Sequence, residues 1–338
     1  NKADHLFQWL WANVPKMEAF DLLMSVAIPK NAMDDHYFIF PAYTWRMMDK
    51  VIGWEHMATL MRPAVRYTAR FPAPRLMPDI DATIEKHGLL TRVLRQRTSD
   101  DEIESIGALG EAMWAVSDYN AIPGLVAEAL VGGLSLEGAG EALSIGAAGL
   151  FLRSQTGNPM DVHLHTSANL RRYLLGLDGL SIRNKLMLLL TWQTGPEVKS
   201  TQYRMEPFPG YDKSAVAALP RRSQAELLDA IKHSVYTQPP TDWSKITNLG
   251  KMIAVPEVRD TVNLALQYFE LGYDPEALIA RLAEIVCHDS FTEMHAFKHH
   301  QAVIEEYRAT RGPWRWMHLV CGAQAAAISF GKNMDVFE

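Results

Sequence analysis

The sequence predicts an all-α protein, and three observations support this class. Apolar residues recur at spacings of three and four along almost every segment, which places them on one face of a helix. Runs that alternate apolar and polar residues, typical of half-buried strands, are nearly absent. Proline, glycine and N-capping residues mostly stand between the periodic segments, where they punctuate helices.

The periodic segments, taken in order, fill most of the chain with helices. They are expected at 4–13, 16–28, 36–51, 54–70, 78–97 (as one or two helices), 101–120, 123–133, 135–153, 165–175, 181–194, 223–235, 246–254, 258–271, 275–287, 291–309 and 314–330. Three of these starts carry N-capping side chains, because Ser99, Ser223 and Asp274 stand just before them. Pro275 follows Asp274 at the first helical position, where a missing N–H costs little.

One stretch, residues 195–222, is predicted to be a long irregular loop. It contains Pro196, Pro207, Pro209 and Pro220, with several aromatic residues among them. Proline removes a backbone donor and interrupts a helix wherever it stands beyond the first turn. A loop of this length inside a compact domain is usually functional or mobile.

We expect a single large domain, 1–338, built from repeated helical hairpins with a pseudo-twofold internal repeat. The segment ALVGGLSLEGAGEAL aligns with YFELGYDPEALIARL, so that Gly133 matches Gly272 and Glu137 matches Glu276. Further along, the segment with His163 and His165 matches the one with His295, and Asn169 matches His299. Duplicated hairpins that pack about a twofold axis would bring these two polar helix openings together.

Composition excludes several classes of function. The formal net charge of −6 argues against nonspecific nucleic-acid binding, which depends on neutralising phosphates with Lys and Arg. The two cysteines rule out a disulfide framework and fit a protein of the reducing cytoplasm. Apolar runs stay shorter than the roughly 18 residues that cross a bilayer, so no membrane is expected. Nucleotide-binding glycine loops and the GxSxG element of hydrolases are absent from the sequence.

The stretch 287–306 concentrates polar residues on one helical stripe. His288, His295, His299 and Glu306 fall within about 40° of one direction at about 100° per residue. His295 and His299 are four residues apart, so both rings could reach one point, as in many helix-borne metal sites. Upstream, His163 and His165 follow Asp161, which would act as a cap or as a carboxylate that orients an imidazole.

These residues are the candidates for a site with one or two metal ions. The proposed ligands are His163, His165, His288, Glu293, His295 and His299. Nitrogen and oxygen ligands without cysteine fit iron, manganese or zinc, and iron is favoured. In the alternative interpretation, these are buried histidines that pack helices together and satisfy their hydrogen bonds internally. His318, close to Trp314 and Trp316, could belong to a pocket or to the core.

Three segments resemble a known family. HAFKHHQA, DVHLHTSAN and DKVIGWEHMATLMRPAVRY are similar to elements of the questin-oxidase-like proteins and of the helical domains that accompany some Rieske ferredoxin domains. The resemblance implies repeated helical hairpins and, for the questin-oxidase branch, Baeyer–Villiger-type cleavage of an aromatic ring. It points to His165, His295 and Lys298 as catalytic residues. This chain has Phe40-Pro41 where such proteins tend to place a histidine, and it has no Rieske Cys-His motif.

The resulting expectation is an oxidoreductase, more narrowly an oxygenase, that acts on a small apolar or aromatic molecule at the histidine-rich site. NADPH or a separate redox partner protein would supply electrons from outside. One alternative is a non-enzymatic helical module that binds a ligand or serves as a redox-partner subunit. A further alternative is a metal-dependent hydrolase. Lys298 lies about 80° from the histidine stripe, which favours a structural role for it.

Overall fold

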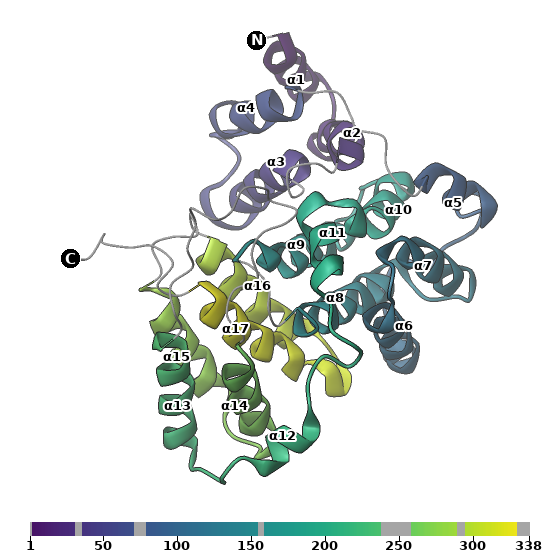
Figure 1. Ribbon diagram of the computed structural model, residues 1–338. Helices are drawn as coiled ribbons and strands as arrows, with labels where there is room; N and C mark the ends of the chain where they lie inside the picture. The colour runs from purple at the N-terminus through teal and green to yellow at the C-terminus, as the bar shows by residue number, and fades with distance from the viewer. Residues whose placement is uncertain are drawn as a thin grey trace. The chain divides into compact units, whose positions relative to one another are not determined.

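The computed structural model describes residues 2–30, 36–70, 79–154, 159–237, 258–288 and 295–329. Within these ranges the chain forms α-helices joined by turns and short 3-10 segments, and it contains no strand (Figure 1). The predicted all-α class is therefore confirmed. Among the same residues, no helix has the length and apolar character needed to cross a membrane. The helix predicted at 246–254 lies outside the described residues.

The α-helices follow one another along the chain in the order of Figure 1. They are α1 (Lys2–Asn13), α2 (Lys16–Ala27), α3 (His36–Met47), α4 (Met57–Thr68), α5 (Ile80–Lys86), α6 (Ile103–Ala115), α7 (Ile122–Val131), α8 (Leu136–Leu152), α9 (His163–Leu175), α10 (Ile182–Leu190), α11 (Pro196–Thr201), α12 (Lys213–Ala218), α13 (Gln224–Tyr236), α14 (Arg259–Glu270), α15 (Pro275–Val286), α16 (His295–Ala309) and α17 (Trp316–Ser329).

The chain divides into two compact units, each assembled from separate parts of the sequence. Unit 1 comprises Asn1–Leu109, Asp118–Glu141 and Leu170–Lys199, and unit 2 comprises Gly110–Ser117, Ala142–Asn169 and Ser200–Glu338. Divisions fall inside α6, α8, α9 and α11, and one more falls between α6 and α7. The expected single domain and its pseudo-twofold repeat stay predictions. The two matched glycines do share a local geometry, because Gly133 (φ 103°) and Gly272 (φ 70°) both adopt positive φ after a helix.

Local capping agrees with the sequence at all three predicted starts. The carboxylate of Glu102 accepts the backbone N–H of Ser99 ahead of α6. Ser223 and Glu226 form a reciprocal capping box at α13. At α15 the carboxylate of Asp274 accepts the N–H of Glu276 at 3.0 Å. Each contact satisfies a donor that the first helical turn leaves open, which explains why these helices begin where they do.

The helix predicted over 78–97 is much shorter than expected. It ends at Lys86, and Gly88 then takes a positive φ of 62°. The backbone carbonyls farther along this segment bond to a distant part of the chain. Arg95 O accepts the N–H of Leu136 (2.9 Å), and Gln96 O accepts the N–H of Glu137 (3.2 Å). These bonds satisfy donors at the start of α8. Hydrogen bonding between residues 95–96 and α8 therefore replaces the carboxyl-terminal part of the helix that the apolar pattern predicted over 78–97.

The loop predicted over 195–222 is partly helical, and that prediction needs correction. Pro196 opens the short helix α11, where proline is tolerated because the first turn has no use for its missing N–H. Further along, Asp212 caps α12 by accepting the N–H of Ser214 at 2.8 Å. The prolines therefore separate short helices instead of abolishing them, and only the stretch between α11 and α12 stays largely irregular.

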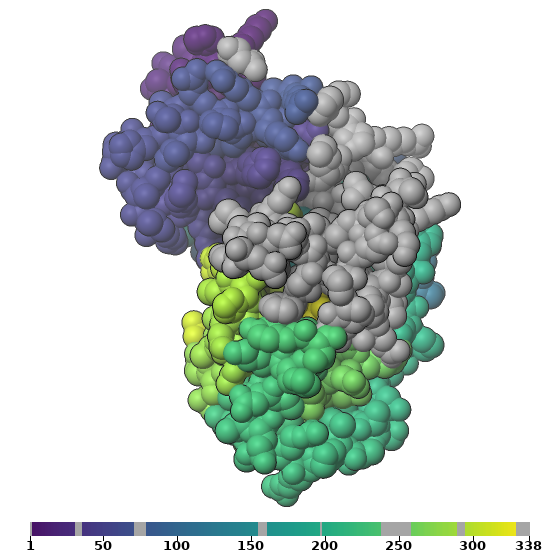
Figure 2. Space-filling view, turned by 60° about the vertical axis from the view of Figure 1, so that its left-hand side comes forward, coloured from purple at the N-terminus to yellow at the C-terminus, as the bar shows by residue number. Residues whose placement is uncertain are grey.

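Unit 1 is held together at its amino-terminal end by aromatic packing. Helices α1 to α4 contact one another, and their atoms form a continuous purple-to-blue surface on the face drawn in Figure 2. At their centre the ring of Trp45 stacks on Phe20 at 4.3 Å and meets Trp54 edge-on at 4.6 Å. Elsewhere in the unit, fully buried Arg171 donates to Thr191 at 2.8 Å and lies 4.7 Å over Phe38. Burial of these large rings provides most of the stabilisation available here.

Unit 2 is built around two buried helices. Helix α17 packs against α13, α14, α15 and α16, and all its residues from Met317 to Ile328 are buried. The second half of α8 is buried as well, and its carbonyls bind side chains of α17. Cys321 donates to Ala148 O (3.3 Å) and Gln324 donates to Phe151 O (2.8 Å). A helix that is buried all round is mostly apolar, so the few polar residues on it stand out.

Candidate functional site

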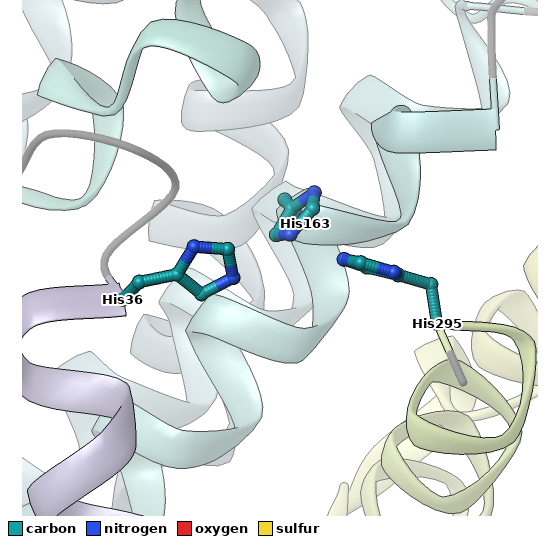
Figure 3. A group of neighbouring side chains, drawn as sticks. All are labelled: His36, His163 and His295. Carbon is teal, nitrogen blue, oxygen red and sulfur yellow. The ribbon is translucent and has the colours of Figure 1, made fainter. Parts of the chain in front are cut away.

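Helices α9 and α16 present histidines to each other at their first residues. His163 begins α9 and His295 begins α16, and their ring centroids lie 4.9 Å apart with an interplanar angle of 67°. Figure 3 shows the two rings directed toward each other. His163 is buried and His295 is half-buried. The third side chain in that figure, His36, belongs to unit 1, where its ring stacks on Phe40 at 5.1 Å.

A second histidine pair lies farther along the same two helices. The rings of His165 and His299 are 5.2 Å apart and nearly perpendicular, at 87°. Phe151 of α8 meets both rings, at 5.8 and 5.6 Å. Both histidines are buried. The four rings thus form two pairs across α9 and α16, so His295 and His299 have different partners instead of converging on one.

A hydrogen-bonded chain leads from the second pair into α17. The Nε2 atom of His165 lies 3.2 Å from Nδ1 of His318, and Nε2 of His318 lies 3.0 Å from the hydroxyl of Thr310. Over the described residues, Nδ1 of His165 has no hydrogen-bond partner. A buried N–H without an acceptor is rarer than an unused lone pair. The proton of His165 is therefore assigned to Nε2, which donates to His318, and Nδ1 keeps its lone pair.

The burial of the second pair keeps both imidazoles neutral. Desolvation lowers the pKa of His165 to about 4, and the nearby carboxylate of Glu306 only partly opposes this effect. Desolvation also places the pKa of His299 well below its ordinary value, with a further lowering by neighbouring His165. Nε2 of His299 has no hydrogen-bond partner within the described ranges. The pair therefore offers two basic nitrogens in a dry environment.

A buried carboxylate organises polar groups farther along the same face of α16. Glu306, 2% exposed, accepts from the hydroxyl of Ser144 at 2.6 Å and from the amide of Asn169 at 2.8 Å. The same amide also donates to Glu305 at 3.1 Å. These bonds connect α8, α9 and α16, and a carboxylate that is satisfied in this way can remain inside the protein.

Asp161, the carboxylate just before α9, pairs with an arginine. Its two oxygens accept from the two terminal nitrogens of Arg204 at 2.7 and 2.6 Å, in a bidentate arrangement. Asp161 is buried, and Arg204 comes from the segment after α11. The pair fastens that segment beside the start of α9, two residues before His163.

The remaining predicted site residues lie apart from the two pairs or outside the described residues. His288 is exposed and stands two residues beyond α15, which ends at Val286. The stripe would include it only if its helix extended back that far, and residues 289–294 lie outside the described residues, so its place in the site stays a prediction. Lys298 is half-buried and contributes a repulsive charge that lowers the pKa of His299. Glu293 lies outside the described residues.

Three contributors were not predicted as site residues: Ser144, Thr310 and His318. Their sequence signal is weak, since Ser144 and His318 are single polar residues between apolar ones, and Thr310 stands in a polar turn beside Arg311. For His318 the signal could have been found, because it interrupts the apolar run that becomes α17. A polar group on a helix buried all round needs a partner, which the chain to His165 supplies.

Searches for related proteins found no match. No protein-family model matches the chain, and neither does any curated protein or solved structure. The resemblance in the three motif segments therefore stays an expectation, and the residues themselves carry the functional argument.

Proposed function

We propose that this chain is a metal-dependent oxidoreductase, an oxygenase of a small and largely apolar molecule, with a metal ion bound by His163 and His295. The observation that carries the proposal is the pairing of these two rings. Imidazoles that bind one ion at about 2.1 Å and about 90–110° to each other would have centroids about 4.5–5.3 Å apart. The measured separation of 4.9 Å fits this requirement. Partial exposure of His295 leaves a route of access for the ion.

The donor set favours iron over manganese and zinc. The paired donors are imidazole nitrogens, and neither cysteine belongs to the group, because Cys321 donates to Ala148 and Cys287 is exposed. Two histidines and one carboxylate with open positions are typical of non-haem iron oxygenases, and this pair would supply the two histidines of such a set. Manganese prefers more oxygen donors than this pair offers. Bound iron would supply one-electron and dioxygen chemistry, with electrons from NADPH or from a separate redox partner protein.

The neighbouring residues His165, His318 and Thr310 would accept and transfer protons during the reaction. The lone pair on Nδ1 of His165 can accept a proton, and the charge is then shared along the chain through His318 to the hydroxyl of Thr310. A pKa of about 4 keeps His165 neutral at neutral pH, so it would hold a proton only transiently and pass it on. The aromatic edge of Phe151 and the burial of the pair exclude water, which suits an apolar substrate better than hydrolysis.

Metal analysis and oxygen uptake test the proposal together. Purified chain loaded anaerobically with Fe(II) should retain about one equivalent of iron and consume dioxygen on exposure to air. In His163→Ala/His295→Ala, iron retention should fall at least about tenfold, and oxygen uptake should fall with it. His233→Ala removes an exposed histidine of α13 and serves as the matched control that leaves both measurements unchanged. Circular dichroism of each variant reports folding.

Three outcomes would contradict the proposal. A folded wild-type chain that retains no metal would leave the non-enzymatic ligand-binding or redox-partner interpretation. Iron that survives in the folded double variant would place the ion elsewhere. Preferential zinc binding without oxygen uptake would favour the hydrolase alternative.

A further inference from the structure

Unit 2 contains a pocket that shares no residue with the histidine pairs. It has a volume of about 250 Å³ and is lined by Tyr211, Lys213, Leu266, Phe269, Glu270 and Trp316. The lining comes from three places in the fold: the start of α12 with the segment before it, the carboxyl-terminal part of α14 and the first residue of α17. This volume is below the usual range of about 300–1,000 Å³ for drug-sized ligands, which suits a small molecule.

Aromatic rings form the main walls of this pocket. Tyr211 meets Trp316 at 6.0 Å with an interplanar angle of 88°, so the two rings stand at a corner. The other side of Tyr211 stacks on Trp114 at 6.1 Å and 22°. Phe269 adds a third ring to the lining. Aromatic rings in a pocket wall attract a cation through their faces, and an alkylated ammonium group matches both the apolar surface and the negative potential of such faces.

The tyrosine wall is held in place before any ligand binds. Arg153 donates to the carbonyls of Trp114 (2.7 Å), Val116 (2.7 Å) and Glu206 (2.8 Å), which fastens the segment before Tyr211 to the ends of α6 and α8. Gly210 has a φ of 87°, and an added Cβ would lie 2.7 Å from Cα of Arg153. Such preorganisation lowers the entropic cost of binding.

The charges around the pocket favour a ligand with a positive end and a negative end. Glu270 ends α14, where the helix dipole adds partial negative charge. Burial raises the pKa of Tyr211 first of all, and the carboxylates of Glu270 and Glu111 raise it further, which is a sign of negative potential at this wall. Lys213, exposed at the first residue of α12, supplies the opposite charge at the rim.

We propose that this pocket binds a small betaine-type zwitterion, a molecule with a quaternary ammonium group and a carboxylate. The ammonium end lies between Tyr211, Phe269 and Trp316 and faces Glu270. The carboxylate end faces Lys213. This pocket would bind its small molecule independently of the histidine pairs. The proposal does not depend on the proposed metal ion.

Calorimetric titration of the full chain with glycine betaine tests this assignment. The matched comparison compound is 3,3-dimethylbutanoate, which has the same shape and carboxylate but a neutral carbon in place of the ammonium nitrogen. Betaine should bind saturably, and the neutral isostere should bind at least about tenfold more weakly. Trp316→Leu and Glu270→Gln should each weaken betaine binding on the order of tenfold. His288→Gln should leave the affinity unchanged.

Several results would overturn the proposal. Binding of the isostere as tight as that of betaine would make the pocket merely apolar. Failure of betaine to bind the folded wild-type chain would exclude the assigned ligand. Unchanged affinity in folded Glu270→Gln would also exclude the site, and this exposed position tolerates the substitution without loss of fold.

Discussion

At the scale of single residues, unit 2 places titratable groups where water cannot reach them. His165 and His299 are kept neutral, and Glu306 is satisfied by Ser144 and Asn169. Removing a partner from such a set leaves a buried polar atom without a hydrogen bond, which costs about 1–3 kcal/mol. The arrangement therefore couples stability to the protonation state of the histidines.

The pH dependence of stability follows from His165. Burial lowers its pKa from 6.5 to about 4, so the unfolded chain binds more protons between these values. The free energy of unfolding of the metal-free chain should fall as the pH decreases through this window, by about 3 kcal/mol from His165 alone. Urea denaturation at several pH values measures this fall.

A matched pair of variants isolates this contribution. His165→Gln retains a nitrogen for the bond to His318 and does not titrate, so its pH dependence should be smaller by about 3 kcal/mol. His288→Gln removes an exposed histidine and should keep the wild-type profile. An undiminished fall in stability for His165→Gln would mean that folding does not lower the pKa of His165.

At the scale of elements, glycines allow α6 and α8 to approach closely within unit 2. A Cβ on Gly149 would lie 2.1 Å from Cγ of Trp114, and one on Gly146 would lie 2.8 Å from Cβ of Met113. Trp114 cannot move aside freely, because its indole N–H donates to Pro209 O at 3.1 Å. The same tryptophan supports Tyr211, so this helix contact also sets the wall of the small-molecule pocket.

Gly149→Ala should therefore destabilise the chain by about 3 kcal/mol, because overpacking against Trp114 outweighs the better helix propensity of alanine. Gly124→Ala in α7 is the matched control, since an added Cβ there meets nothing within 4 Å. It should be neutral or stabilising by up to about 1 kcal/mol. Chemical denaturation compares the two, and equal effects would show that α6 and α8 do not approach closely.

At the scale of the whole molecule, the candidate site depends on segments that are distant in sequence. Asn169 and Glu306 bond across 137 positions, and unit 2 is gathered from three separate parts of the chain. A metal ion shared by α9 and α16 would add a link between such distant segments. Any ligand that binds only the folded state stabilises it by mass action.

Removal of the metal should accordingly lower the thermal stability of the whole chain. With the ion at about a thousand times its dissociation constant, binding contributes about 4 kcal/mol, and chelation should lower the melting temperature on the order of 5 °C. Scanning calorimetry before and after treatment with a chelator measures the change. His163→Ala/His295→Ala should melt at the same temperature in both conditions. A chelator effect that persists in this variant would place the stabilising ion at another site.

Much of the local structure could be predicted from the sequence by itself. Apolar periodicity was enough for the all-α class, and capping side chains such as Ser223 and Asp274 located helix starts. The four-residue spacing of His295 and His299 put both rings on one face of α16. These features depend on neighbours within one or two helical turns, so a short stretch of sequence contains all the information they need.

Contacts between distant segments were decided only by the tertiary structure. It pairs His163 with His295 and His165 with His299, adds His318 from a third helix, and leaves His288 exposed beyond the end of α15. Such contacts depend on how helices pack, and packing depends on side-chain volumes and glycine positions along the whole chain. The sequence therefore determined which residues could form a site, while packing within unit 2 determined which of them meet.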